Sequence, residues 1–207
     1  MSDNGERQRH WEQVYREKAE DAVSWFQARP QVSLELIRSC TAAADAVIDV
    51  GGGASRLAEQ LLAAGYADLT VLDIAEPALR RVRERLGPDA SKLRWLTADV
   101  TRWRPLRQYA LWHDRAVFHF LTEAADRAAY LANLRAGLRP GGHALMASFA
   151  LDGPERCSGL PVRRYSPESL TLELGQGFRL LASRSEDHLT PLGRVQRFQY
   201  SLLARVD

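Results

Sequence analysis

The sequence predicts a three-layer α/β/α fold on a seven-stranded sheet, mostly parallel, with an antiparallel hairpin at the C-terminus. Three observations support this prediction. Short apolar runs alternate with amphipathic helical patterns between about residues 46 and 149. The first run ends at Gly51-Gly52-Gly53 and leads directly into a helical pattern. The last two strand patterns are too close together for a crossover helix, which favours a hairpin. Right-handed connections then place helices on both faces of the sheet.

The expected elements follow in chain order, before and within the sheet. Two helices are expected first, at about 10–19 and 32–40. Strands are expected at about 46–50, 69–73, 93–97, 110–113, 143–149, 178–187 and 195–205, the fourth having the weakest pattern. Helices between them are expected at about 55–64, 76–86 and 122–137, and from Ser166-Pro167, which is typical of a helix start. Arg139-Pro140-Gly141-Gly142 predicts a turn before the fifth strand.

The chain of 207 residues is expected to form one domain. Residues 1–44 form a helical cap, 45–150 a ligand-binding core, and 151–207 a loop and the final hairpin. The net charge is +2 with acids and bases interleaved, so nucleic-acid binding is not expected. Cys40 and Cys157 match no metal-ligand spacing, and no metal or disulfide framework is expected. A polar N-terminus and the lack of a membrane-spanning run favour a cytoplasmic protein without membrane contact.

The glycine-rich loop and two aspartates form the first candidate site. The loop alone fits either ligand binding or close packing of a strand and a helix. Asp73 ends the second strand about twenty residues later, where a carboxylate accepts ribose hydroxyls; its alternative role is to cap the next helix. Asp99 ends the third strand and could reach a purine amine, or simply form a turn. Carboxyl ends of neighbouring parallel strands meet at one edge, so the pattern predicts an adenosine site.

Two cofactor types would fit an adenosine held in this way. A dinucleotide site has a third glycine that allows close helix packing, but Arg56 stands at that position. The terminal hairpin also differs from the second half of a dinucleotide-binding fold. A dehydrogenase is therefore disfavoured.

The chain resembles the class I S-adenosylmethionine-dependent methyltransferases from about residue 45 to the C-terminus. The segments that carry the resemblance are Asp49-Val50-Gly51-Gly52-Gly53, Asp73-Ile74, Ala98-Asp99-Val100 and Leu138-Arg139-Pro140-Gly141-Gly142. The front end, with Trp11, Tyr15 and Trp25, looks like small bacterial members and, more loosely, methyltransferase-like protein-lysine methyltransferases. Ser55 departs from the family, in which many members carry glycine. The resemblance implies a Rossmann-like fold and S-adenosyl-L-methionine as cofactor.

The resemblance also implies roles for individual residues around that cofactor. Asp49 would organise the loop, and the loop glycines would face the methionine part. Asp73 would bind the ribose hydroxyls and Asp99 the adenine amine, while Asp114 would lie near the sulfonium. The full implied cofactor-binding set is Asp49, Gly51, Gly52, Gly53, Asp73, Ile74, Asp99, Val100 and His113.

Candidates for the acceptor site come from four segments, at residues 25–26, 113–115, 118–119 and 155–165. His119 has an unperturbed pKa near neutrality and could act as a base, or could form a local hydrogen bond at a helix start. Asp114 is the second catalytic candidate. The substrate-binding candidates are Trp25, Phe26, Arg115, Arg163 and Tyr165. The two aromatics could form a lid or a plain core contact, and Arg163 could hold an acidic group or be an ordinary surface arginine.

These observations predict methyl transfer from S-adenosylmethionine to a small molecule. A protein-lysine methyltransferase is the alternative enzyme, and a non-catalytic S-adenosylmethionine-binding module is the alternative of another class. An enclosed pocket would favour a metabolite, whereas an open acidic or aromatic groove would favour a lysine side chain. Methyl transfer needs alignment and water exclusion rather than a covalent nucleophile, so the lack of a nucleophile motif is compatible with it.

Overall fold

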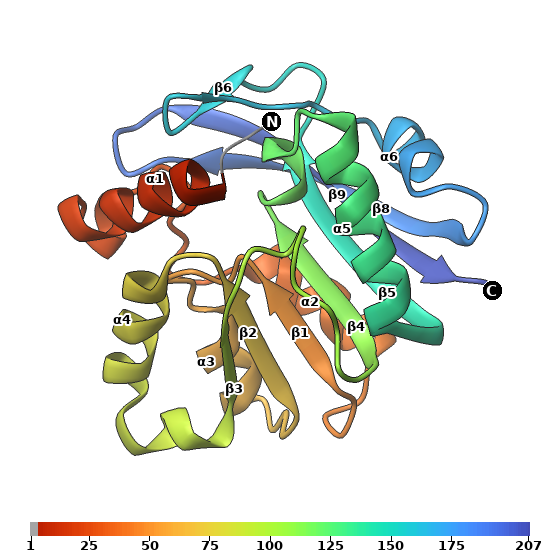
Figure 1. The fold of residues 1–207 in the computed structure, drawn as a ribbon, viewed down its shortest axis with the longest axis horizontal. Coiled ribbons are helices and arrows are strands. Elements are labelled where there is room, and N and C mark those ends of the chain that lie inside the picture. Colours follow the sequence, from red (N-terminus) through yellow and green to blue (C-terminus); the bar gives the residue numbers. More distant parts are fainter. Residues whose placement is uncertain (1–3) are drawn as a thin grey trace.

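A computed structural model describes residues 4–207, which contain a seven-stranded sheet in the order β3-β2-β1-β4-β5-β9-β8 (Figure 1). The first five strands run parallel, whereas β9 is antiparallel to both β5 and β8. The strands are β1 Val47–Val50, β2 Leu69–Asp73, β3 Arg94–Thr97, β4 Tyr109–Arg115, β5 Leu138–Phe149, β8 Phe178–Leu189 and β9 Val195–Arg205. This architecture confirms the fold class predicted from the sequence.

Helices cover both faces of the sheet. On one face lie α2 Gln31–Cys40, α3 Leu57–Ala63 and α4 Glu76–Leu86, and on the other lie α5 Ala124–Gly137 and α6 Pro167–Leu174. Successive strand residues point to opposite faces, so Val47 joins the first apolar core and Ile48 the second. Both faces of the central strands are therefore buried, which explains their nearly continuous apolar sequence.

The helix α1 Asn4–Glu17 lies outside these layers, across the edge at which β1 and β2 end, and packs beside α4 (Figure 1). It begins at Asn4 and ends at Glu17, so the predicted span of about 10–19 was placed too late. A short 3-10 helix, Glu20–Ala22, and an irregular stretch then lead to α2. The helix α2 belongs to a face of the sheet, since Leu34 and Ile37 lie in its core. We refer to residues 4–30, which cover the sheet edge, as the cap segment.

The strand β4 differs most from its prediction. Its expected span was 110–113, yet it runs over Tyr109–Arg115 at the centre of the sheet, between β1 and β5. His113 and Asp114 made it look like a strand end, but both side chains are buried and hydrogen-bonded within the fold. Trp112 is also fully buried, and its indole N–H donates to the Tyr130 hydroxyl at 2.9 Å. Internal partners thus allow a polar sequence to occupy a central strand.

Three further features complete the fold: an irregularity within β5, a short ribbon after it and the helix α6. The turn expected at 139–142 is an irregularity inside β5, where the pairing with β4 shifts and Gly141 has φ of +70°. The loop after β5 contains a short antiparallel ribbon that the sequence did not predict, β6 Arg156–Cys157 with β7 Leu160–Pro161. The helix α6 starts at the expected Ser166, which forms a capping box with Ser169.

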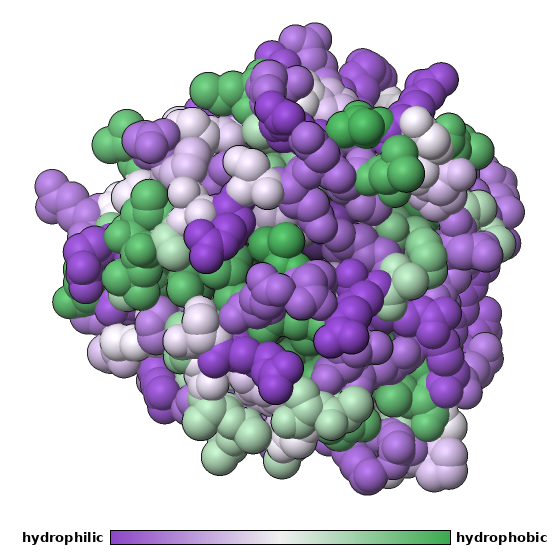
Figure 2. Space-filling model, turned by 180° about the vertical axis from the view of Figure 1, so that it is seen from behind, coloured by the Kyte–Doolittle hydropathy of each residue, from purple (hydrophilic) through white to green (hydrophobic). Residues whose placement is uncertain are grey.

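The surface helices can be compared with what a membrane span requires. None of the helices within residues 4–207 is long and apolar enough to cross a bilayer. On the face opposite to that of Figure 1, apolar side chains lie in small groups separated by hydrophilic ones (Figure 2). A concave, mostly apolar surface lies beneath the cap segment.

Candidate active site

The cap segment and the carboxyl ends of the strands enclose a cavity of about 750 Å³, including the part open to solvent. We call it the main cavity. The helix α1 contributes Arg7, Trp11 and Tyr15 to its lining, which are four residues apart and therefore share one face of the helix. A second, inner cavity of about 560 Å³ adjoins it between the cap segment, α2 and the glycine loop. Tyr15, Trp25, Gly51 and Arg115 line both.

The glycine loop brings bare backbone to the border between the two cavities. Gly51 and Gly53 have φ of +67° and +48°, a region that favours glycine. A Cβ on Gly51 would lie 1.9 Å from Val117 Cγ2, and one on Gly53 would lie 2.4 Å from the Tyr15 hydroxyl. Both positions therefore exclude a side chain. Gly51 lines both cavities and Gly52 lines the inner one, whereas Gly53 lines neither.

Asp49, His113 and Ser33 form a buried chain of hydrogen bonds beside this loop. Asp49 Oδ1 is 2.7 Å from His113 Nδ1, and His113 Nε2 is 2.9 Å from Ser33 Oγ. The chain joins β1, β4 and α2, and it holds the Asp49 carboxylate in one orientation. Asp49 Oδ2 is buried without a hydrogen-bond partner among the described residues, and Asp49 lines the inner cavity. Sequence reasoning missed Ser33, although a serine on the apolar face of a predicted helix was an available signal.

Asp73 lies on the floor of the main cavity at the end of β2. Its Oδ1 accepts the backbone N–H of Ala75 at 2.8 Å, in the turn before α4. Ala75 is the N-cap residue of α4, and this helix has no side-chain cap, so the helix-capping alternative left open by the sequence is not seen. Burial raises the pKa of this carboxyl to about 7, although backbone N–H groups oppose the shift. A ligand that donates hydroxyl hydrogen bonds would stabilise the ionised form. Ile74 lines the cavity next to it.

Asp99 also lines the main cavity and forms hydrogen bonds with two parts of the fold. Its Oδ2 is 3.1 Å from Arg7 Nη1, and its Oδ1 accepts hydrogen bonds from the backbone and hydroxyl of Thr101. The turn-forming role left open by the sequence is therefore present. Arg7 also reaches Asp126 at 2.5 Å, which ties α1 to α5. Val100 lines the cavity beside Asp99.

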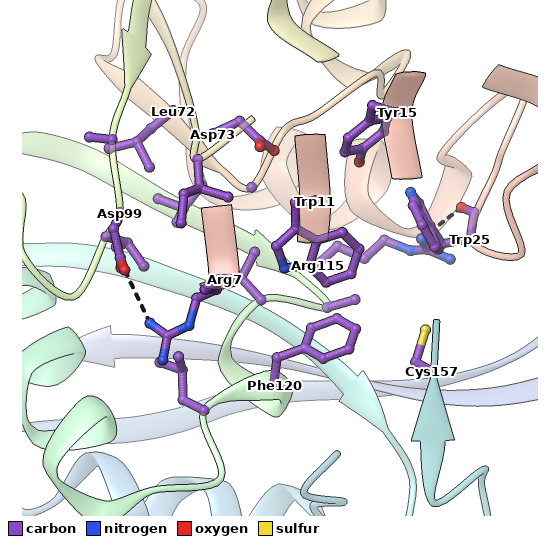
Figure 3. Close-up of a pocket in the computed structure, with 18 residues that line it drawn as sticks. Arg7, Trp11, Tyr15, Trp25, Leu72, Asp73, Asp99, Arg115, Phe120 and Cys157 are labelled. Carbon is purple, nitrogen blue, oxygen red and sulfur yellow. Dashed lines mark hydrogen bonds and ion pairs between the residues drawn. The ribbon is translucent and has the colours of Figure 1, made fainter. Parts of the chain in front are cut away.

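Aromatic side chains form the wall opposite these aspartates. Trp11 packs edge-to-face against Trp25, with ring centroids 5.8 Å apart, and against Phe120 at 4.9 Å. Tyr15 packs against Trp25 at 6.1 Å. Figure 3 shows Asp73 and Asp99 on one side of the cavity, Trp25 and Cys157 on the other, and Trp11 between them. Phe26 lines the inner cavity.

Arg115, at the end of β4, lines both cavities. Its Nε donates to the Tyr200 hydroxyl and its Nη1 to the Trp25 carbonyl, each at 3.0 Å. The guanidinium also lies 4.3 Å from the centroid of the Phe198 ring. Its Nη2 is buried without a partner among the described residues.

Several candidates from the sequence do not line either cavity. Asp114 is fully buried, accepts from the Tyr130 hydroxyl at 2.5 Å and caps the turn at Val117 and Phe118; burial raises its pKa to about 6. His119 is fully buried between Phe120 and Phe149, and burial lowers its pKa to about 3. Neither residue touches the space in which a ligand would lie. Their catalytic roles remain predictions.

The late loop also contributes less than expected. Arg163 is paired with Glu173 at 3.2 Å on the surface, and Tyr165 is buried against Phe118. Neither lines the main or the inner cavity. Cys157 does line the main cavity, and burial raises the pKa of its thiol to about 11. Within residues 4–207, no group of three or more His, Cys, Asp and Glu side chains could hold a metal ion.

Comparison with known sequences identifies the domain. A family model described as a methyltransferase domain matches residues 47–142. The chain is similar to the eEF1A lysine and N-terminal methyltransferase of Mus musculus, with 27% identity over 93 residues, which are 45% of this chain and 13% of that protein. It is also similar to Nodulation protein S of Rhizobium tropici, with 30% identity over 101 residues, which are 49% of this chain and 42% of that protein. The chain therefore matches less than half of either relative.

The fold is shared over the whole chain with a solved structure. The 1,6-didemethyltoxoflavin-N1-methyltransferase of Burkholderia thailandensis, solved with 1,6-didemethyltoxoflavin and S-adenosylhomocysteine, superposes with a TM-score of 0.72 at 19% identity. The match covers 100% of this chain and 92% of that one. Residues 47–142 therefore match a methyltransferase domain, and the chain has the Rossmann-like fold of the class I S-adenosylmethionine-dependent methyltransferases. The family resemblance seen in the sequence is confirmed.

Proposed function

We propose that the protein transfers a methyl group from S-adenosylmethionine to a small molecule bound under the cap segment. One observation carries the proposal. The bare backbone of Gly51, the buried Asp73 carboxylate and the aromatic cap meet at one cavity, partly open to solvent, at the carboxyl ends of β1, β2 and β4. Ligands bind at this edge of open α/β sheets, and the match to a methyltransferase domain over residues 47–142 names the chemistry.

The described residues fit the cofactor. Asp73 would accept the ribose hydroxyls, and Ile74 and Val100 would pack beside the adenine. The unpartnered Asp49 Oδ2, oriented by His113, would accept a hydrogen bond from the ammonium of the methionine part. When bound, S-adenosylmethionine supplies a methyl group activated by its sulfonium. The contribution of the chain is to position both reactants and, through Trp11, Trp25 and Phe120, to exclude water.

A catalytic base is not part of the proposal. The pKa of His119 is held near 3 by burial, so the residue is a poor proton acceptor in this environment. An acceptor with its own unprotonated amine or thiolate would need no base. If His119 does act as a base, His119→Asn would lower kcat while leaving the affinity for S-adenosylhomocysteine unchanged.

A small-molecule acceptor fits the cavity better than a lysine side chain. Similarity to the mouse eEF1A lysine and N-terminal methyltransferase favours a protein substrate, but it covers 45% of this chain. The cap segment closes over the cavity, and the unpaired side of Arg115 would repel a lysine ammonium. We also propose a cytoplasmic location, since both cysteines are unpaired.

The first experiment is calorimetry with S-adenosylmethionine and S-adenosylhomocysteine. We expect binding that Asp73→Ala weakens by about a hundredfold or more, because two charge-assisted hydrogen bonds are lost. Asp89→Ala is the matched control, since Asp89 is exposed and pairs with Lys92 nearby on the surface. Absence of heat with the unmodified protein would overturn the proposal.

The second experiment identifies the acceptor class. The protein is incubated with cofactor labelled in the methyl group and with fractionated cell extract. Label in the low-molecular-weight fraction supports a small-molecule acceptor, and label in protein supports the lysine alternative. Cofactor binding without label in any fraction supports a non-catalytic binding module.

A further inference from the structure

We propose that the acceptor carries a carboxylate, and that Arg115 binds this group next to the site of methyl transfer. This inference rests on the proposed function and specifies the substrate class of the same site. It also moves the expected anion site from Arg163, which is already paired with Glu173, to an arginine inside the cavity.

The fold holds the Arg115 guanidinium in a fixed position. Tyr200 and the Trp25 carbonyl each accept one hydrogen bond from it at 3.0 Å, and the Phe198 ring lies 4.3 Å beneath its central carbon. These partners come from β9 and from the cap segment. A guanidinium oriented in advance loses little conformational entropy when it binds a planar carboxylate.

The same guanidinium lacks a carboxylate partner within the described residues. The ion pairs of residues 4–207 do not include Arg115, and its Nη2 is buried with no acceptor. Glu186 is connected to it only indirectly, since Tyr200 accepts from Arg115 and donates to Glu186 at 2.7 Å. A buried guanidinium N–H without an acceptor is costly, and an anionic ligand would supply the acceptor.

The charge of the cavity lining points to the same group. Arg7 and Arg115 are the two arginines that line the main cavity within residues 4–207. Arg7 is neutralised by Asp99 and Asp126. Arg115 is thus the cation of this lining that is left to interact with a bound anion, and a charge-assisted hydrogen bond between a guanidinium and a carboxylate is stronger than a neutral one.

The position of Arg115 separates this anion site from the proposed adenosine site. Asp73 ends β2 and Asp99 follows β3, whereas Arg115 ends β4 and contacts β9, on the opposite side of β1 in the sheet order. Figure 3 shows the two aspartates on one side of the cavity and Trp25 and Cys157 on the other, with Arg115 beside Trp25. Because Trp11, Trp25 and Phe120 line the space between, the acceptor should present its carboxylate on an apolar or aromatic frame.

The carboxylate could also come from the methionine part of the cofactor, because Arg115 lines the inner cavity as well. The two sources differ in a measurable way. If Arg115 binds the methionine carboxylate, its substitution would weaken the binding of S-adenosylhomocysteine but not of methylthioadenosine, which lacks that group. If Arg115 binds the acceptor instead, its substitution would leave the affinity for both ligands unchanged.

The test compares acids with their neutral amides. Competition calorimetry compares the affinity of the protein for acetate, benzoate, phenylacetate and indole-3-acetate with its affinity for the matching amides. The protein is saturated with S-adenosylhomocysteine throughout. We expect at least one acid to bind about tenfold more tightly than its amide. Arg115→Gln should remove this preference, Arg115→Lys should keep part of it, and Arg179→Gln, a change at an exposed arginine, should leave it intact. Circular dichroism and thermal melting check that each variant is folded.

Three outcomes would overturn the inference. In the unmodified protein, none of the acids is preferred over its amide. In the second, the preference for the acid survives in folded Arg115→Gln. In the third, Arg115→Gln weakens the binding of S-adenosylhomocysteine at least about tenfold and leaves the binding of methylthioadenosine unchanged. If Arg115→Gln does not fold, the comparison in unmodified protein and in Arg115→Lys decides. If S-adenosylhomocysteine itself does not bind, the proposed function fails, and the acids and amides measured without it still test Arg115.

Discussion

Asp73 serves two purposes with one carboxylate. It accepts the backbone N–H of Ala75 in the turn before α4 and faces the main cavity, yet its pKa is raised to about 7 by burial. Without a ligand, the folded protein holds a proton on Asp73 at pH values at which the unfolded chain, with its ordinary pKa of 3.8, does not. The contribution of Asp73 to stability therefore falls as pH rises from about 4 to 7.

This shift predicts a pH-dependent affinity for S-adenosylhomocysteine. Ribose hydroxyls donate to the ionised carboxylate, so binding must remove the proton from Asp73. We expect the affinity to rise by up to about tenfold per pH unit below pH 7 and to level off above it. Calorimetry between about pH 5.5 and 8.5 measures this, and Asp73→Asn should flatten the profile. An affinity that is constant over this range would contradict the prediction.

Gly51 is the second residue whose chemistry can be tested alone. Its φ is positive, and a Cβ added there would lie 1.9 Å from Val117 Cγ2, so Gly51→Ala should both strain the backbone and displace a neighbour. We expect the free energy of unfolding to fall by about 2–3 kcal/mol and cofactor binding to weaken strongly. Urea denaturation and calorimetry measure these effects.

Gly65→Ala is the matched control for Gly51→Ala. Gly65 has φ of +89°, but no atom of the described residues lies within 4 Å of a Cβ built there. Only backbone strain of about 1–2 kcal/mol is expected, with cofactor affinity unchanged. Equal effects of the two substitutions on binding would show that close approach at Gly51 is unimportant.

At the scale of the element, the position of α1 depends on a few contacts at one of its faces. Arg7 pairs with Asp99 and Asp126, while Trp11 and Tyr15 pack on the aromatic wall. The rest of the helix is polar and largely exposed. Such an element opens more readily than the sheet that it covers.

Arg7→Ala should therefore loosen α1 without destabilising the sheet. Because the Arg7 side chain is 22% exposed, its ion pairs should contribute about 1 kcal/mol to the free energy that holds α1 on the sheet. We expect severalfold faster amide hydrogen exchange in residues 4–17 and unchanged exchange in β1 and β4. Arg16→Ala, which removes an exposed pair with Glu12, is the control and should change little. Faster exchange throughout the sheet would contradict this view of α1.

Two elements show why the sequence predicted some segments and not others. The strand β2 and the helix α4 were predicted at their observed limits, because apolar periodicity and Gly87-Pro88 mark them locally. The strand β4 was underestimated, since His113 and Asp114 look like loop residues until their partners Asp49, Ser33 and Tyr130 are known. Those partners are distant in sequence, so no local pattern reveals them.

At the scale of the whole molecule, a single sheet joins both apolar cores. Leu145 in β5 is fully buried, and its strand pairs with β4 on one side and β9 on the other. Loss of packing there should affect the entire domain rather than one part.

Leu145→Ala should lower the free energy of unfolding by about 2–5 kcal/mol through lost burial and a residual cavity. Urea unfolding followed by tryptophan fluorescence and by far-ultraviolet circular dichroism should show coincident shifts in a single transition. Leu106→Ala is the control, because Leu106 is 97% exposed, and it should change stability by less than about 0.5 kcal/mol. Two separate transitions would indicate that the hairpin or the cap segment unfolds independently.

The sequence by itself determined the layered fold, the glycine loop and the strand ends on which Asp73 and Asp99 lie. These features depend on local periodicity, on glycine conformation and on the rule that parallel strands end at the same edge. The tertiary structure decided which polar side chains face the cavity. It placed Arg7, Ser33 and Arg115 around the site and kept His119, Asp114 and Arg163 out of it. The reason is physical: burial and long-range partners fix the direction and charge of a side chain, and neither is encoded in its neighbours along the chain.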